Sequence, residues 1–225
     1  MLPWIELDTA PVPDGGTLKL MQRGTEFWIM AGTNPLMTSR QSGSEEALAS
    51  LALARLAGRP KPRLLIGGLG MGFTLRAALA LAPPDAEITV AEIVPKIIDW
   101  ARGPLAPLFA GCLDDKRVII ERADVANLIA AAPRRWDAIL LDVDNGPEGL
   151  SRDGNDRLYS AAGLHMAKTA LTPKGVLAVW SAHPDAPFTK RLGMAGFTVI
   201  EEKVRARGKS GGARHLIWLA TPAIR

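Results

Sequence analysis

The chain has 225 residues and a mass of 24.0 kDa, enough for one sizeable hydrophobic core and a short appendage but not for two full domains. With 48% hydrophobic and 22% charged residues, its composition is that of a globular protein and excludes disorder. The net charge of +4 is concentrated at one end, because residues 203–225 hold six basic and no acidic residues. A basic stripe can bind nucleic acid, but Gly208, Gly211 and Gly212 within it are typical of a solvated hairpin tip. We therefore do not expect nucleic acid as a partner.

Targeting segments and metal sites are not indicated either. No apolar run approaches the ~20 residues that a membrane span needs, and Pro3, Glu6 and Asp8 interrupt the N-terminus where a signal or transit peptide would lie. The single Cys112 excludes an internal disulfide, and the sequence has no Cys/His cluster to hold zinc. We expect a cytoplasmic protein without a membrane partner and without a metal.

In chain order, the first 60 residues predict a small β-rich unit. Residues 17–22 and 26–31 are strand-like and are joined by a turn, and Ser44 begins an Ala/Leu-rich helix with acidic residues in its first turn. We expect residues 1–60 to form a small β-hairpin cover plus a helix.

From about residue 63, short apolar runs alternate with helical stretches. The apolar runs are residues 64–66, 88–91, 118–120, 138–141 and 176–180. Each is too apolar for a strand with one exposed face, which is typical of a parallel sheet buried on both faces. The Ala/Leu-rich stretches between them are residues 74–81, 95–109, 124–132 and 158–171. This alternation predicts a doubly wound α/β domain.

The last strand-like runs differ from the others. Residues 197–204 and 215–220 flank the basic, glycine-rich tip and predict an antiparallel hairpin at the edge of the sheet. Residues 61–225 are therefore expected to form one Rossmann-like domain with a mostly parallel, seven-stranded sheet.

The strongest local signal is a glycine loop between the first strand and helix of this domain, with Gly67, Gly68, Gly70 and Gly72. Glycines let the backbone turn sharply and approach a ligand under a helix N-terminus. A P-loop needs a lysine where Phe73 stands, which argues against a nucleoside triphosphate. The dinucleotide fingerprint also meets Phe73 in place of its third glycine, which argues against NAD. The remaining class is the adenosylmethionine fold.

Acidic residues follow the next three strands, and their positions suit an adenosyl ligand. Glu92 closes the second strand, where such a site needs an acid for the ribose hydroxyls. Asp124 follows the third strand, where an acid can bond the adenine amino group. Asp142 and Asp144 end the fourth strand, at the cleft where the strand order reverses. Four acids in this register indicate an adenosyl-type ligand.

Five segments also carry a family resemblance. They are Leu-Ile-Gly-Gly-Leu-Gly-Met-Gly at 65–72, Ala-Glu-Ile at 91–93, Trp-Asp-Ala-Ile-Leu-Leu-Asp-Val-Asp at 136–144, and residues 158–171 and 173–177. In these segments the chain resembles the polyamine aminopropyltransferases (spermidine synthase-like proteins), a branch of the class I S-adenosylmethionine (SAM) methyltransferase fold. The resemblance covers residues 36–182 well and implies a transferase of polyamine biosynthesis that forms a homodimer.

The resemblance also implies roles for single residues. The expected donor site, for decarboxylated SAM or SAM, consists of Gly67, Gly68, Leu69, Gly70, Gly72, Glu92, Ile93, Asp124, Val125 and Asp142. Glu92 would hold the ribose and Asp124 the adenine. Asp142 would be the catalytic acid that orients or deprotonates the attacking amine, with Asp144 as the second choice.

The amine half of the site departs from the family pattern. The family's glycine loop carries an aspartate that grips the donor's terminal ammonium, and here that position is Gly70. The gate motif Asp-x-x-Asp-Pro is altered at residues 142–147, and the Tyr-His/Gln-Glu motif is Ser44-Glu45-Glu46, without the aromatic ring. We therefore expect an amine acceptor other than ordinary putrescine.

Two further residues and one loop are candidates for the acceptor side. Glu46 stands at the family's glutamate position, although an acid in the first turn of a helix needs no such role. His183 follows the fifth strand at the edge of the cleft, and the glycine-rich residues 145–157 form a candidate lid. Asp142 and Asp144 have a purely structural alternative too, because they can cap this loop.

Two other functions stay open. The first is a SAM-dependent methyltransferase, because Gly70 leaves room for a donor carboxylate that an aspartate would repel. The second is a non-catalytic protein that binds an adenosyl ligand, because the acceptor residues are altered. In each case the expected partners are small molecules: a donor, and an amine or another small acceptor.

Overall fold

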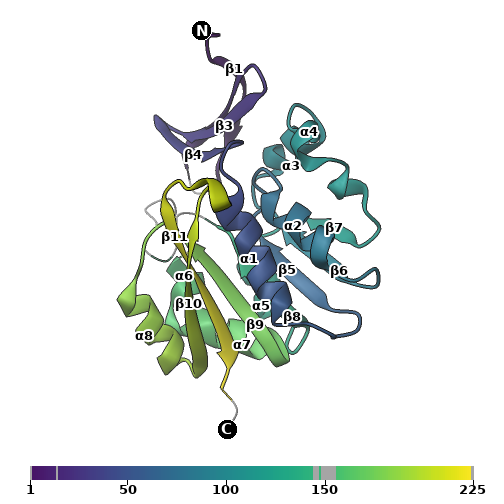
Figure 1. The fold of residues 1–225 in the computed structure, drawn as a ribbon, viewed down its shortest axis with the longest axis vertical. Helices are drawn as coiled ribbons and strands as arrows, with labels where there is room; N and C mark the ends of the chain where they lie inside the picture. The colour runs from purple at the N-terminus through teal and green to yellow at the C-terminus, as the bar shows by residue number, and fades with distance from the viewer. Residues whose placement is uncertain (1, 14, 144–146, 148–155, 224–225) are drawn as a thin grey trace.

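The protein is described by a computed structural model covering residues 2–13, 15–143, 147 and 156–223, and its strands form two sheets (Figure 1). The larger has seven strands in the order β10-β11-β9-β8-β5-β6-β7. Their bounds are β5 (Arg63–Gly67), β6 (Glu87–Ala91), β7 (Val118–Glu121), β8 (Trp136–Leu141), β9 (Leu171–Ser181), β10 (Phe197–Arg205) and β11 (Arg214–Pro222). The strands from β5 to β9 pair in parallel, and β11 pairs antiparallel with both β9 and β10. The predicted doubly wound sheet with its C-terminal hairpin is confirmed.

The apolar runs are buried on both faces of this sheet. Along β5, Leu64 and Ile66 belong to one core cluster and Leu65 to the other, and all three are fully buried. The same alternation holds along β8, where Ile139 faces the second cluster and Leu140 the first. Side chains alternate between the faces of a strand, so continuous apolar runs supply two cores at once.

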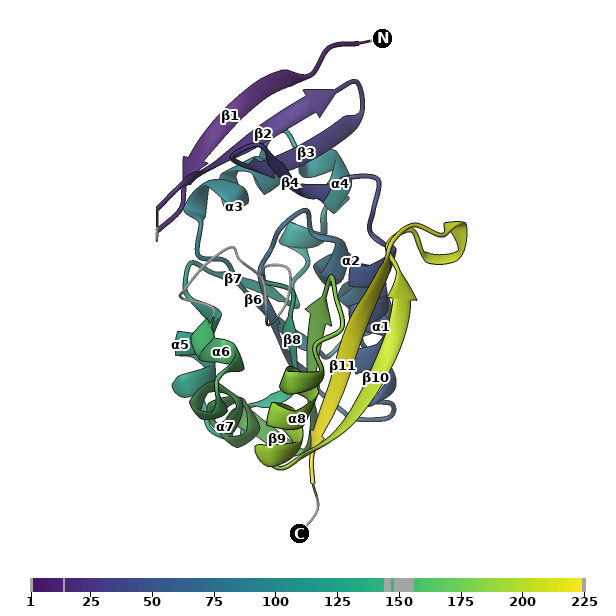
Figure 2. The ribbon, with the colours of Figure 1, turned by 90° about the vertical axis from the view of Figure 1, so that its left-hand side faces the viewer.

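Helices cover both faces (Figure 2). On one face lie α1 (Gly43–Ala54), α2 (Phe73–Leu81), α3 (Pro95–Arg102) and α4 (Ala106–Phe109). On the other lie α5 (Val125–Ala130), α6 (Asp156–Tyr159), α7 (Ala161–Ala170) and α8 (Ala186–Met194). No helix in the described part of the chain is long and apolar enough to cross a membrane.

Three helical predictions need correction. Residues 158–171 were expected to form one helix, but α6 ends at Tyr159 and the extended Ser160 is the N-cap of α7. Residues 95–109 were expected to form one helix, but the helix breaks at Gly103, whose backbone is not helical and which precedes Pro104. Proline disfavours helical backbone in the residue before it, which accounts for the break. Helix α8 was not predicted, because Pro187 and Gly193 weaken its helical signal. Pro187 is tolerated there because it lies in the first turn.

The N-terminal sheet has four antiparallel strands, of which two were predicted. They are β1 (Ile5–Pro11), β2 (Thr17–Arg23), β3 (Glu26–Ala31) and β4 (Asn34–Thr38), paired in chain order. The strands that were not predicted, β1 and β4, are the two edges of this sheet. Both contain a proline, Pro11 and Pro35, which edge strands tolerate but which weakens a strand signal in the sequence.

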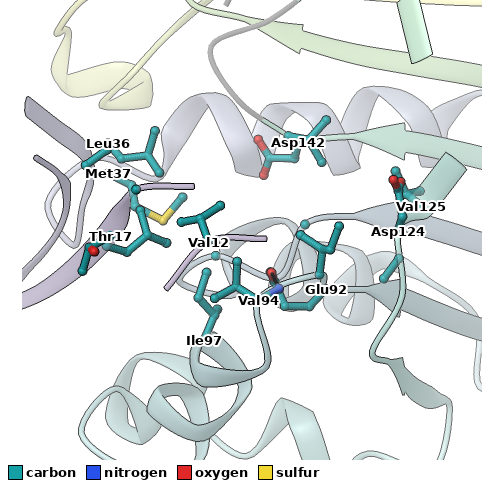
Figure 3. Close-up of a pocket in the computed structure, with 18 of the residues that line it drawn as sticks. Val12, Thr17, Leu36, Met37, Glu92, Val94, Ile97, Asp124, Val125 and Asp142 are labelled. Atoms are coloured by element: carbon teal, nitrogen blue, oxygen red, sulfur yellow. Dashed lines mark hydrogen bonds between the residues drawn. The ribbon is translucent and has the colours of Figure 1, made fainter. Parts of the chain in front are cut away.

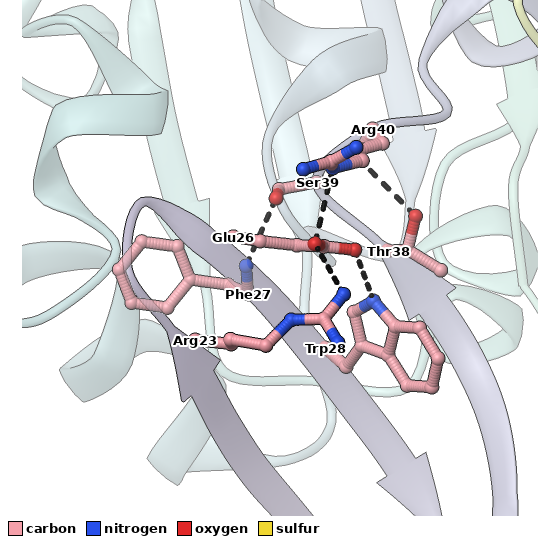
Figure 4. A network of polar contacts seen from close by, with 7 residues as sticks. All are labelled: Arg23, Glu26, Phe27, Trp28, Thr38, Ser39 and Arg40. Atoms are coloured by element: carbon pink, nitrogen blue, oxygen red, sulfur yellow. Dashed lines mark hydrogen bonds and ion pairs between the residues drawn. The ribbon is translucent and has the colours of Figure 1, made fainter. Parts of the chain in front are cut away.

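A buried acid holds the N-terminal sheet to the segment that leads into α1 (Figure 4). The Glu26 carboxylate accepts a 2.9 Å bond from the Trp28 indole and pairs with Arg23 at 3.1 Å and Arg40 at 3.0 Å. Burial opposes its charge, but the bonds from Trp28 and Arg23 and the charge of Arg40 hold the pKa of Glu26 below its ordinary value. The network therefore stabilises the loop between β4 and α1.

The same sheet is tied to the main domain through β1. The Trp100 indole of α3 donates a 2.9 Å hydrogen bond to Asp8, and Lys96 pairs with the same carboxylate at 3.0 Å. Asp8 lies on β1, so these contacts fix the N-terminal sheet over the first turns of α3. A cavity is left between the two sheets.

Candidate active site

The cavity has a volume of about 620 Å³ and lies between the N-terminal sheet and the carboxyl ends of β5, β6 and β8. Figure 3 shows Leu36 and Met37 on one side of it, and Asp142, Glu92 and Asp124 on the other. The strand order reverses between β5 and β8, which is where open α/β sheets bind their ligands. The size is that of a small-molecule site.

Most of the expected donor residues line this cavity. Those that do are Gly68, Gly70, Glu92, Ile93, Asp124, Val125 and Asp142. Three other predicted residues shape the glycine loop instead: Gly67 ends β5, Leu69 is buried, and Gly72 precedes α2.

Gly68 shows why this loop needs glycine. Its φ is +87°, and a Cβ atom there would lie 2.7 Å from the carbonyl oxygen of Asp142. Its own N–H donates a 2.9 Å bond to Ala91 O, so the loop passes tightly between the ends of β6 and β8. The close approach brings the loop backbone to the cavity wall.

At Gly70, a side chain from the N-terminal sheet occupies the neighbouring space. A Cβ atom at Gly70 would lie 3.0 Å from Met37 Cε and 3.2 Å from its sulfur. Met37 belongs to β4 and lines the cavity. An apolar group therefore stands beside the position where the family's glycine loop carries an aspartate.

Glu92 ties the glycine loop to the end of β6. Its carboxylate accepts a 3.0 Å bond from Leu69 N and a 2.8 Å bond from Val94 N, and only 4% of the residue is exposed. Burial raises the pKa of Glu92, against the opposing effect of these backbone N–H groups. The backbone N–H groups of Gly70 and Ile93 also favour the charged form, and the carboxylate lies in the cavity wall, where a ligand can reach it.

Asp124 has a structural role as well as a place in the cavity wall. It is the N-cap of α5, because its Oδ1 accepts a 2.8 Å bond from Ala126 N. The cap fixes the carboxylate beside Ala123 and Val125, which also line the cavity. Its second oxygen is free of any bond within the described part of the chain.

Asp142 lies directly after β8 and is bonded to the first turn of α2. The Thr74 hydroxyl donates a 2.6 Å hydrogen bond to Asp142 Oδ2. Burial raises the pKa of Asp142 to about 6, although the Thr74 bond favours the charged form. This is a carboxylate whose affinity for a proton is tuned towards neutral pH, as general bases require.

A second carboxyl group, which sequence reasoning did not select, stands near Asp142. Glu45 in the first turn of α1 is half-buried, and burial together with the charge of Asp142 raises its pKa to about 7. Its Oε2 accepts a 2.6 Å bond from the Ser44 hydroxyl. The only sequence signal was its place in the altered family motif, next to Glu46.

The two weaker acceptor candidates lie outside the cavity. Glu46 is exposed and pairs with Arg76 at 3.6 Å, because it follows Glu45 on the helix and therefore points in a different direction. His183 is exposed in the loop after β9. Asp144 and nearly all of the candidate lid, residues 145–157, lie outside the described residues.

The charge of the cavity is one-sided. Among the described residues that line it, Glu92, Asp124 and Asp142 are acidic and none is basic. The remaining walls are mainly apolar, with Val12, Leu36, Met37, Val94 and Ile97 among them. Such a site suits a ligand that combines positive charge with apolar parts.

Curated polyamine aminopropyltransferases are similar to part of this chain. The polyamine aminopropyltransferase of Corynebacterium efficiens is 31% identical over 136 residues, which cover 59% of this chain and 25% of that protein. The one from Mycobacterium tuberculosis is 31% identical over 124 residues, 54% of this chain and 23% of that protein. The one from Saccharolobus solfataricus is 27% identical over 157 residues, 70% of this chain and 50% of that protein. The chain thus matches a quarter to a half of these relatives.

Solved structures show the same fold. The spermidine synthase from Thermotoga maritima superposes with a TM-score of 0.76 and 19% identity, covering 98% of this chain and 74% of that one. A spermidine synthase in complex with the transition state analogue AdoDATO gives a TM-score of 0.75 and 18% identity, over 98% and 73% of the two chains. The family model of the spermine/spermidine synthase domain matches residues 42–190. Since this match spans well over half of its length, the chain belongs to the spermine/spermidine synthase domain family.

Proposed function

We propose that this protein transfers an aminopropyl group from decarboxylated SAM to an amine acceptor. The observation that carries the proposal is the charge of the cavity, whose described lining residues include three acids and no base. Decarboxylated SAM has a sulfonium and a terminal ammonium and no carboxylate, so these acids attract it. Intact SAM also carries a carboxylate, which the same acids would repel.

The surroundings of Gly70 favour the same donor. The missing aspartate does not open a subsite for a carboxylate, because the apolar Met37 stands 3.0 Å from the position of a Cβ atom at Gly70. A methyl donor would have to bury its carboxylate against this thioether without a basic partner among the described lining residues, which is costly. A methyltransferase is therefore the less favoured reading of this site.

In the proposed complex, each acid has one task. Glu92, which lines the cavity and is held by backbone N–H groups of the glycine loop and of the end of β6, accepts hydrogen bonds from the ribose hydroxyls. Asp124 offers its second oxygen to the adenine amino group while its first oxygen caps α5. A spermidine synthase of the same fold binds the transition state analogue AdoDATO, which supports a donor site in this fold.

Asp142 acts as the base. It takes one proton from the acceptor's ammonium group, and the nitrogen lone pair this frees forms a bond to the methylene carbon next to the sulfonium. The bond from this carbon to sulfur breaks, its electron pair stays on sulfur, and the sulfonium becomes a neutral thioether. With a pKa raised to about 6, Asp142 is ionised at pH 7 to 8 but still attracts a proton.

The acceptor is proposed to be an amine with an apolar body rather than putrescine. Putrescine is a diamine whose far ammonium needs a second carboxylate. The part of the described cavity wall beyond Asp142 comes from the N-terminal sheet and is mainly apolar, with Val12, Leu36 and Met37. An alkyl or aromatic monoamine fits these walls without an unpaired buried charge.

Titration calorimetry with decarboxylated SAM and, separately, with SAM tests the donor. We expect clear preference for the decarboxylated form, followed by transfer to at least one amine of an acceptor panel in a mass-spectrometric assay. Preference for intact SAM would overturn the aminopropyl proposal in favour of methyl transfer. If folded protein binds neither donor, the proposal that it is an enzyme of this class is overturned.

A further inference from the structure

One hydrogen bond joins the C-terminal hairpin to the first turn of α1, and a second continues it within that turn. His215 Nδ1 lies 2.9 Å from Ser44 Oγ, and Ser44 Oγ lies 2.6 Å from Glu45 Oε2. Ser44 is fully buried, so its hydroxyl exchanges bonds with these two side chains rather than with bulk water. A hydroxyl both donates and accepts, and the three groups therefore form a continuous hydrogen-bonded chain.

The hairpin is built to hold this arrangement. Gly43 N donates a 2.9 Å bond to Ala206 O, and a Cβ atom at Gly43 would lie 2.2 Å from Gly208 N. The glycine-rich tip thus packs directly on the start of α1. The His215 ring also meets Trp180 of β9 edge-on, with ring centroids 4.8 Å apart. These contacts give the hairpin a structural use that its basic composition did not indicate.

At its Glu45 end, this hydrogen-bonded chain lies close to Asp142, the proposed base. The Thr74 hydroxyl lies 2.6 Å from Asp142 Oδ2 and 3.5 Å from the backbone oxygen of Glu45, so both carboxyl-bearing residues pack on one side chain. The charge of Asp142 raises the pKa of Glu45, which places the two carboxyl groups within electrostatic reach. Two carboxyl groups that interact in this way titrate as a coupled pair.

At its His215 end, this hydrogen-bonded chain reaches the protein surface. The His215 ring is half-buried, and the neighbouring His183 is exposed. Burial and the charge of His183 lower the pKa of His215, so its ring releases a proton readily at neutral pH. Among the described residues, the charged groups that affect the pKa of Glu45 are Asp142 of the site and Glu46 of its own helix, and Glu46 pairs with Arg76 of α2.

We propose that Glu45, Ser44 and His215 form the proton outlet of Asp142. The inference rests on the proposed function, in which each turnover leaves one proton on Asp142. That proton passes within the carboxyl pair to Glu45, whose O–H then donates to Ser44 Oγ while the Ser44 proton moves to His215 Nδ1. The imidazolium loses its Nε2 proton to water, and exchange of its ring protons with water restores the starting tautomer. Glu45 and His215 are positioning residues in this scheme, because neither contacts the reacting atoms.

NMR titration of the His215 ring in the full-length protein tests whether Glu45, Ser44 and His215 form a hydrogen-bonded chain. We expect the His215 signals to show a second step near pH 7, where Glu45 titrates, in addition to the titration of the ring. Ser44→Ala removes the second step, and Ser50→Ala, which alters an exposed serine of the same helix, keeps it. A second step that persists in Ser44→Ala would show that Ser44 does not connect Glu45 to His215, and would overturn the hydrogen-bonded chain.

The outlet is tested by turnover. We expect Ser44→Ala and His215→Ala to lower kcat about tenfold with an unchanged KM for the donor, and added imidazole to restore the His215→Ala rate in a concentration-dependent way. His165→Ala, at an exposed histidine of α7, is the control and loses nothing. An unchanged kcat, or a loss that imidazole does not restore, would overturn the outlet. If the wild type transfers no aminopropyl group at all, the proposed function fails, whereas the NMR titration still decides whether the chain exists.

Discussion

The Thr74 hydroxyl donates a 2.6 Å hydrogen bond to Asp142 Oδ2, and this contact links the first turn of α2 to the end of β8. Helix α2 begins directly after the glycine loop, so the loop that faces the donor also sets the position of the proposed base. The bond favours the charged form of Asp142, while burial favours the neutral form. The balance between these two effects decides how basic Asp142 is.

Replacing the Thr74 hydroxyl changes the pKa of Asp142 without changing Asp142 itself. Thr74→Val keeps the shape of the side chain but removes the hydroxyl that donates the hydrogen bond. The neutral form of Asp142 then becomes relatively more stable, and the acidic limb of the pH profile of kcat moves to higher pH. We expect kcat at pH 7 to fall about tenfold, in the range that one hydrogen bond to a charged group supports. Thr74→Ser retains the donor and is the matched control. A pH profile of Thr74→Val that overlies the wild-type profile would contradict this role of Thr74.

Donor binding and turnover are expected to depend on different acids. Glu92→Gln puts an NH₂ group against one of the two backbone N–H donors, Leu69 N or Val94 N, and we expect it to weaken donor binding at least tenfold by calorimetry. Asp142→Asn keeps an oxygen for the Thr74 hydroxyl and keeps the donor pocket, so donor affinity should change less than threefold while turnover is largely lost. Turnover retained by Asp142→Asn would exclude it as the base.

The strands of the main sheet could be predicted because their signal is local. Each is a continuous apolar run, and burial on both faces leaves no competing pattern. The acids at the ends of these runs were found for the same reason, since a strand end fixes where its next residues lie. Glu92, Asp124 and Asp142 therefore line the cavity as expected.

The missed features depend on packing between distant segments. Glu45 and Glu46 are adjacent acids in one helical turn, and only the seating of α1 on the sheet decides that Glu45 lies near Asp142 while Glu46 faces Arg76. His215 is 171 positions from the Ser44 that it contacts. No periodicity or spacing in the sequence predicts that contact.

The closeness of the glycine loop to β8 predicts a specific cost for a small side chain. Gly68→Ala would bring a Cβ atom to 2.7 Å from the Asp142 carbonyl oxygen, and that backbone cannot move without displacing the end of β8. We expect a loss of roughly 2–4 kcal/mol in the free energy of unfolding and no measurable donor binding. Gly58→Ala also adds a Cβ atom at positive φ, +78°, but meets nothing within 4 Å, so it isolates the backbone strain. Equal losses in the two variants would show that the contact with Asp142 contributes nothing.

The two carboxyl groups of the site make stability depend on pH. Burial raises the pKa of Asp142 from 3.8 to about 6, and burial with the charge of Asp142 raises that of Glu45 from 4.5 to about 7. Between about pH 4 and pH 7 the folded protein therefore holds more protons than the unfolded chain, and its stability falls as pH rises through this window.

Neutral analogues should remove this dependence. Glu45→Gln and Asp142→Asn keep an oxygen acceptor for Ser44 and Thr74 but carry no charge at any pH. At pH 8 we expect each to have a free energy of unfolding roughly 1–3 kcal/mol above the wild type, and at pH 4 the same value as the wild type, in urea titrations. Asp114→Asn alters an exposed carboxylate paired with Arg102 and is the control. A gain of equal size at pH 4 and pH 8 would mean that charge in the site is not its source, because only an ionising group can make the gain change with pH.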